Sequence, residues 1–206
     1  MRITMPLAGG LALLAALTAC SGPGNQPGDD SPYTGTEIDG AFTLPSITFT
    51  DNKGKDYNLK ADSEGVTTAV FFGFTNCPDI CPTTMADMAQ AVDKLDPDER
   101  ERFKVVFVTA DPDRDDPELI DMWLSSFNPD FTGLSGTLED TDEAASDLGI
   151  SISRPEDREG DYQVGHGSQT LVFSPEGESE LMWNYGTEPD AIADDLKLLL
   201  KEDNTP

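Results

Sequence analysis

The sequence predicts an α/β fold, with a central sheet flanked by helices and an N-terminal β-hairpin. Residues 67–74 and 104–109 are almost continuously apolar and rich in β-branched and aromatic side chains, which is typical of strands covered on both faces. A helical pattern follows each of these strands, and such alternation is typical of a parallel sheet. With 206 residues, the chain has room for one such domain and tails.

The elements of the N-terminal half follow from local patterns. Residues 42–58 alternate on either side of a turn signal at 51–54, which predicts the hairpin. After the strand at 67–74, apolar residues at helical spacing predict an amphipathic helix over residues 81–95. Pro82 suits the first turn of this helix, because the N–H group that proline lacks has no helical partner there.

The C-terminal half continues the alternation and ends with a hairpin and a helix. The strand at 104–109 is followed by a loop with helix-start residues. Periodicity and turn signals then predict a helix around 120–127, a short strand near Leu134, a helix over 141–148, a polar loop over 154–161, strands at 168–173 and 181–183, and a helix over 190–201.

The charge of the chain excludes some classes of partner. Forty acidic residues against thirteen basic ones give a formal net charge of −27. Nucleic acid is excluded as a partner, because its phosphates would be repelled, and an anionic lipid surface is disfavoured for the same reason. The acidity itself fits either solubility in a salty environment or attraction of cations and basic partners.

The N-terminus reads as a targeting signal. Residues 1–19 combine a positive end with an apolar stretch too short to span a bilayer comfortably, and the tetrapeptide 17–20 resembles a bacterial lipoprotein box that ends at Cys20. We therefore expect a lipoprotein signal peptide over 1–19, a flexible tether over 20–40 with a lipid on Cys20, and the folded domain over 41–203. This predicts a lipid-anchored protein of the cell membrane that faces the extracytoplasmic side.

Two cysteines lie where the strand at 67–74 gives way to the next helix. Cys77 and Cys81 are separated by three residues, and cysteines at such a junction suggest a thioredoxin-like fold. The positive end of the helix dipole favours thiolates, so we expect lowered cysteine pKa values. The pair suits either a metal site or a reversible disulfide.

The chain has a single histidine, His166, flanked by glycines just before the strand at 168–173. Together with the two thiolates, its imidazole completes a ligand set for a soft, low-coordinate cation such as Cu(I). The same set with an open position also suits zinc. Alternatively, this histidine is a solvated surface residue of a loop.

Other candidate residues have more ordinary interpretations. Asp79 lies between the cysteines, where it either supports a ligand or starts the helix. Met85 and Met88 share the spacing of the apolar helix face, so we expect them in the core. Three acidic residues after the strand at 104–109 are expected to cap the next helix: Asp111, Asp113 and Asp115.

Three segments resemble motifs of the Sco/SenC family of thioredoxin-like copper proteins. Residues 73–82 resemble its metal-binding motif, residues 108–118 the loop after the next strand, and residues 161–168 the segment with the distal histidine. Together they anchor the resemblance over about residues 40–200. Two positions depart from the common pattern: Asn76 stands where many members have histidine, and Gly165 where many have aspartate.

The resemblance implies a function and a site. Cys77, Cys81 and His166 would bind one copper ion per chain, as Cu(I) or Cu(II). The protein would be a copper chaperone without turnover that assists assembly of the binuclear copper centre of cytochrome c oxidase subunit II, or would serve another copper protein. The alternative is a thiol–disulfide oxidoreductase that keeps the cysteines of that subunit, or of another exported protein, reduced. The histidine discriminates between them, because disulfide exchange alone does not require it.

Overall fold

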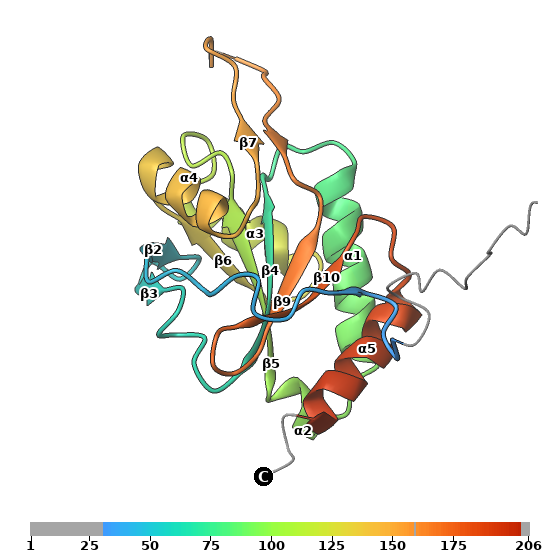
Figure 1. Cartoon of the computed structure of the whole chain (residues 1–206). Coiled ribbons are helices and arrows are strands. Elements are labelled where there is room, and N and C mark those ends of the chain that lie inside the picture. The colour runs from blue at the N-terminus through green and yellow to red at the C-terminus, as the bar shows by residue number, and fades with distance from the viewer. Residues whose placement is uncertain (1–30, 159, 203–206) are drawn as a thin grey trace, which may run out of the picture. The chain divides into compact units, whose positions relative to one another are not determined.

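A central eight-stranded sheet organises the residues that the computed structural model describes, 31–158 and 160–202 (Figure 1). From one edge to the other, its strands are β1 (Thr36–Glu37), β10 (Ser179–Trp183), β9 (Thr170–Phe173), β4 (Thr67–Gly73), β5 (Phe103–Thr109), β6 (Thr132–Ser135), β2 (Thr48–Asp51) and β3 (Asp56–Asn58). Strands β4, β5 and β6 are parallel to one another, and the remaining pairs are antiparallel. The predicted α/β class and the N-terminal hairpin, β2–β3, are confirmed.

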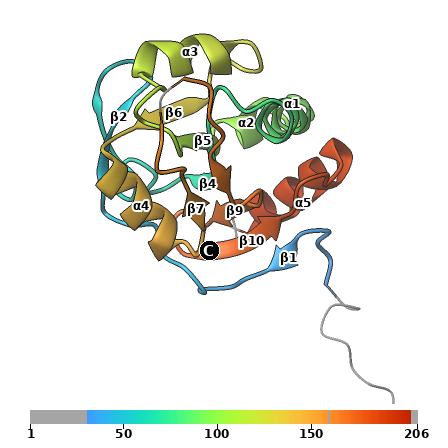
Figure 2. The ribbon, with the colours of Figure 1, turned by 90° about the horizontal axis from the view of Figure 1, so that it is seen from above.

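Helices cover both faces of the sheet, as Figure 2 shows from above. One face carries α1 (Ile80–Asp93), α3 (Pro117–Ser125) and α5 (Pro189–Glu202), and the other carries α4 (Leu138–Asp147). Successive side chains of β4 point to opposite faces of the sheet, as in any strand. Phe71 packs in the cluster that contains α1, α3 and α5, whereas Phe72 packs in the cluster that contains α4.

Helix boundaries differ from the prediction where local capping decides them. Helix α4 begins at Leu138, before the predicted residue 141, because Thr137 and Asp140 form a reciprocal capping box. The four-residue helix α2 (Pro97–Arg100) was not predicted, since so short an element shows no helical period.

The folded part of the chain begins before residue 41. Residues 31–40, predicted as the end of the tether, instead contribute β1, which pairs with β10. The amides of Thr34 and Gly35 each donate a hydrogen bond of 2.8 Å to the carboxylate of buried Asp195. Sequence patterns do not reveal this strand, because two residues are too few to show alternation.

The signal peptide, Cys20 and the first part of the tether lie outside the described residues. Within residues 31–158 and 160–202, none of the helices combines the length and the apolar character needed to cross a bilayer.

A second, two-stranded sheet carries the histidine. Strand β7 (Ile152–Ser153) pairs antiparallel with β8 (Gly165–His166), and Ile152 lies opposite His166. This ribbon stands at the top of Figure 1, beyond the end of β4. The sequence predicted a loop for residue 166, because two-residue strands leave no alternating pattern to detect.

Candidate metal centre

The end of strand β4 positions both cysteines. Gly73 pairs with Thr109 at the carboxyl ends of β4 and β5, and a short turn then leads to α1. A Cβ atom at Gly73 would lie 2.8 Å from the rings of both Phe71 and Phe107 and 3.2 Å from the Sγ atom of Cys81. The missing side chain therefore gives the Cys81 sulfur its space against the sheet.

The three predicted ligand residues converge at this edge of the sheet. The sulfur atoms of Cys77 and Cys81 and a ring nitrogen of His166 all lie within 4.8 Å of one another. The Sγ atom of Cys81 is 3.3 Å from Nε2 of His166. Two ligands that each lie about 2.3 Å from one ion are at most about 4.6 Å apart, so this cluster has nearly the dimensions of a loaded site. Both thiols are free.

The histidine ring is held in one orientation. Its Nδ1 atom lies 2.7 Å from the carbonyl oxygen of Gly167, and because a carbonyl only accepts, Nδ1 carries the proton. Nε2 is then the free acceptor, and it faces Cys81. The rings of Phe71 and Phe74 pack edge-on against the imidazole, each with its centroid 5.8 Å away. The alternative of a solvated surface histidine is therefore wrong.

The pKa values of Cys81 and His166 are shifted in opposite directions. Burial, reinforced by the hydrogen bond with Cys77, raises the pKa of the Cys81 thiol, so the prediction that the helix N-terminus lowers it is wrong at this residue. Burial lowers the pKa of His166, which favours the neutral imidazole that metals bind. A metal ion must therefore displace a proton from Cys81 and none from His166 at neutral pH.

Access to the cluster is one-sided. Cys81 is fully buried, whereas Cys77 and His166 are partly exposed. Asn76, next to Cys77, is exposed and donates a 3.3 Å hydrogen bond to Asp161, on the segment that leads to the histidine. A groove of about 600 Å³ opens beside Asn76, between Trp123 of α3 and Asp161. An approaching molecule can therefore reach the cluster at Cys77 and His166, its two partly exposed members.

The other candidates of the cysteine segment have structural positions. Met85 and Met88 are buried on the core face of α1, as predicted. Asp79 occupies the N-cap position of α1, but its exposed side chain makes no capping hydrogen bond.

The acidic residues after β5 do not cap α3, so that prediction is wrong. Asp116 is the capping residue, and its carboxylate accepts a 2.8 Å hydrogen bond from the amide of Leu119. Asp111 and Asp115 are instead buried, with 0% and 1% of their surface exposed, and Asp113 forms a 2.8 Å ion pair with Arg158. The sequence pattern shows the acidic run but not which of its members point inward.

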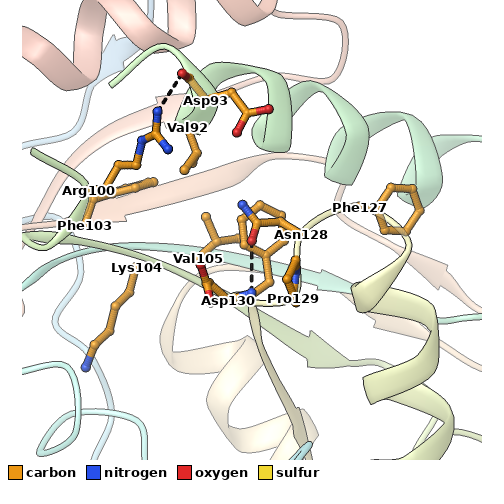
Figure 3. Close-up of a pocket in the computed structure, with 11 residues that line it drawn as sticks. Val92, Asp93, Arg100, Phe103, Lys104, Val105, Phe127, Asn128, Pro129 and Asp130 are labelled. Atoms are coloured by element: carbon orange, nitrogen blue, oxygen red, sulfur yellow. Dashed lines mark hydrogen bonds between the residues drawn. The ribbon is translucent and has the colours of Figure 1, made fainter. Parts of the chain in front are cut away.

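A second pocket lies at the other end of β5 (Figure 3). It measures about 300 Å³, and its lining includes Phe103 and Val105 from the start of β5 and Phe127 beyond α3. The side chains of Arg100 and Asn128 are engaged with backbone groups, as the dashed lines in Figure 3 show. No cysteine or histidine lines this pocket, so it offers no soft metal ligand.

Comparison with known proteins agrees with this geometry. The SCO1/SenC family pattern matches residues 33–201. A protein of Stutzerimonas stutzeri is 34% identical over 134 residues, which are 65% of this chain and 65% of that protein. The human protein SCO1 homolog, mitochondrial, is 34% identical over 147 residues, which are 68% of this chain and 46% of that protein. The chain thus covers less than two thirds of the length of these relatives.

Solved structures of similar proteins share the fold. The apo Sco1 protein of Thermus thermophilus has a TM-score of 0.68 at 35% identity, covering 85% of this chain and 99% of that one. ScoI of Bradyrhizobium japonicum, solved with copper bound, has a TM-score of 0.68 at 26% identity, covering 80% and 98%. A SCO1/SenC family lipoprotein of Bacillus anthracis has a TM-score of 0.68 at 26% identity, covering 79% and 97%. With a thioredoxin-like sheet, converging cysteines and histidine, and a family match over most of its length, the chain belongs to the SCO1/SenC family.

Proposed function

We propose that this protein is an extracytoplasmic copper chaperone that holds one copper ion between Cys77, Cys81 and His166. Its role is to assist assembly of the binuclear copper centre of cytochrome c oxidase subunit II. The observation that carries the proposal is the convergence of two free thiols and one oriented imidazole within 4.8 Å. Membership of the SCO1/SenC family supports copper over zinc, which the same three ligands would also suit.

The environment of the cluster supports binding followed by release. Two thiolates and one neutral imidazole suit Cu(I), which accepts few, soft ligands. Buried Cys81 and the aromatic rings around His166 close the inner side, while Cys77 is partly exposed and follows Asn76, which lines the groove. A ligand of the receiving protein can therefore reach the ion from the Cys77 side while Cys81 and His166 still hold it.

We also propose that a lipid on Cys20 anchors the protein at the outer side of the cell membrane. The support is the sequence of residues 1–20, with its short apolar stretch and lipoprotein-like tetrapeptide. Similarity to a family member of Bacillus anthracis that is a lipoprotein is consistent with it. Anchoring would hold the site near other membrane proteins, including the oxidase subunit.

A second candidate function is thiol–disulfide exchange. The free thiols of Cys77 and Cys81 favour it, because their sulfur atoms lie within 4.8 Å and a modest movement would bring them to bonding distance. In that role the protein would reduce the cysteines of subunit II or of another exported protein. Exchange requires both thiols and leaves His166 without a role.

Anaerobic Cu(I) titration separates the two functions. The full chain carrying Cys20→Ser leaves only the two site thiols, and we expect it to bind one Cu(I) per chain. In this background, His166→Ala should weaken binding, and Cys77→Ser should weaken it further. Disulfide reduction measured in parallel should fail in Cys77→Ser and survive in His166→Ala if exchange is the function. Equal Cu(I) stoichiometry and affinity with and without the histidine would contradict the three-ligand site.

A further inference from the structure

We propose that residues 110–116, between β5 and α3, act as a positioning loop that sets the distance between the two sulfurs and the imidazole. This inference rests on the proposed copper site. The loop holds both segments that carry ligands: the cysteine arm (residues 74–81) and the histidine arm (residues 152–158 and 160–166). None of its own side chains belongs to the ligand cluster. Its residues are therefore positioning residues.

The loop fixes the cysteine arm through Asp115. One oxygen of this buried carboxylate accepts hydrogen bonds from the Thr75 amide, at 2.9 Å, and from the Thr109 hydroxyl, at 2.6 Å. The other oxygen accepts from the Thr75 hydroxyl at 2.6 Å. Thr75 lies two residues before Cys77, so these bonds tie the start of the cysteine arm to the end of β5.

The loop fixes the histidine arm through Asp111 and Arg114. One oxygen of the buried Asp111 carboxylate accepts a hydrogen bond from the Tyr162 hydroxyl at 2.7 Å. The other accepts from Nε of Arg114 at 2.5 Å. The Arg114 guanidinium also donates a 3.0 Å hydrogen bond to the Tyr162 carbonyl and lies 3.6 Å from the centroid of the Tyr162 ring. These contacts enclose Tyr162, which lies four residues before His166.

The other half of the histidine arm is attached to the same loop. Nε of Arg154 donates a 2.9 Å hydrogen bond to the Ala110 carbonyl, and Arg158 pairs with Asp113 at 2.8 Å. The arm has little regular structure of its own, because β7 and β8 contain two residues each. Its placement therefore depends strongly on these side-chain contacts.

The loop is itself anchored to the sheet. The amide of Ala110 donates a 2.6 Å hydrogen bond to the carbonyl of Gly73, the last residue of β4. One short segment thus links the end of the central strand, the cysteines and the histidine. Residues that orient metal ligands from outside the ligand set commonly contribute 10- to 100-fold to metal affinity, about the effect expected here.

Copper affinity in two backgrounds tests this role. We would compare Tyr162→Phe and Arg114→Met, in the full chain carrying Cys20→Ser, by anaerobic competition for Cu(I) with a chelator. Each change should weaken binding by about 10-fold or more when His166 is present, because the imidazole is no longer held at its distance. In chains that also carry His166→Ala, neither change should alter affinity. In the Cu(II) form, nitrogen hyperfine structure in electron paramagnetic resonance should weaken in both variants.

Arg100→Met is the matched control. Arg100 also donates to backbone carbonyls, those of Leu95 and Asp93, but it lies at the other end of β5. It should lower thermal stability without changing Cu(I) affinity. Tyr162→Phe removes only a hydroxyl group, so this variant still tests the positioning role if Arg114→Met does not fold.

Distinct outcomes would overturn the two proposals. If His166→Ala weakens copper binding while Tyr162→Phe does not, or if Tyr162→Phe weakens it equally with and without the histidine, the positioning role is wrong and the copper site stands. If His166→Ala itself leaves affinity unchanged, the three-ligand site fails, and the positioning role fails with it.

Discussion

The cysteine arm and the histidine arm meet at one site but are supported in different ways. The cysteine arm is continuous with β4, all seven residues of which are buried, and with α1, so backbone hydrogen bonds and core packing fix it at both ends. The histidine arm reaches the site on a ribbon of two-residue strands held by contacts of Tyr162 and three arginines, Arg114, Arg154 and Arg158. One half of the site is thus part of the sheet, and the other is attached to it by side chains.

Adding one methyl group to each arm should produce the largest contrast. In Gly73→Ala the new Cβ would lie 2.8 Å from the rings of Phe71 and Phe107, both of which are fully buried. Overpacking of this kind costs about 1–3 kcal/mol of unfolding free energy. In Gly165→Ala the nearest atom, at 2.5 Å, is the hydroxyl of exposed Ser153, which can rotate away. We expect a change within about 0.5 kcal/mol.

Urea unfolding of the two apo variants measures this contrast. A larger loss of stability in Gly165→Ala than in Gly73→Ala would contradict the view that the cysteine arm is the rigid one.

The pH dependence of copper binding distinguishes the arms chemically. Because the pKa of Cys81 is raised, its thiol is protonated near neutral pH, and Cu(I) must displace that proton. Apparent affinity should therefore rise at least about tenfold per pH unit between about pH 7 and 8.5. His166 is already neutral in this range because its pKa is lowered, so it releases no proton.

The slope can be checked with a variant of the other arm. His166→Ala should lower affinity at every pH and leave the slope of log Kd against pH unchanged, as measured by competition titration at several pH values. A shallower slope in the variant would show that the histidine arm also releases a proton.

The smallest expected effect concerns the apo protein in acid. The pKa of His166 is lower in the fold than its ordinary value of 6.5, so the unfolded chain binds more protons as the pH falls below that value. Folding stability contributed by this residue is complete above about pH 6.5 and is lost below it, by at most about 1.4 kcal/mol per pH unit.

His166→Gln should remove this contribution. The difference between wild-type and variant unfolding free energies, followed by denaturant titration from about pH 7 to 5.5, isolates it from the many carboxylates that titrate in both proteins. A difference that does not vary with pH would contradict the lowered pKa.

The two arms also differ in how far the sequence predicts them. Strands β4 and β5 and the helix with Cys81 follow from apolar runs and helical spacing, which are local patterns. His166 was assigned to the site because it is the only histidine and lies in a family motif, but its ribbon pairing was not predicted.

Long-range side-chain contacts explain what the sequence could not predict. Asp115 was expected to cap a helix, whereas it binds Thr75, 40 positions away, and Asp111 binds Tyr162, 51 positions away. Neither of these contacts produces a periodic pattern in the sequence. A signal that could have directed attention to them is the run of acidic residues that begins immediately after β5 ends, at the same edge of the sheet as the cysteines.

The Ala110–Gly73 hydrogen bond has a consequence for insertions and deletions. The pairing of Gly73 with Thr109 and the Ala110–Gly73 hydrogen bond fix the register of the ends of β4 and β5. The connection from α1 through α2 to β5 can therefore change in length without shifting this register. One residue added between Thr109 and Asp115 would instead rotate the carboxylates away from Thr75 and Tyr162. We therefore expect homologous chains to vary in length between residues 94 and 102 and to keep a constant length between residues 109 and 115.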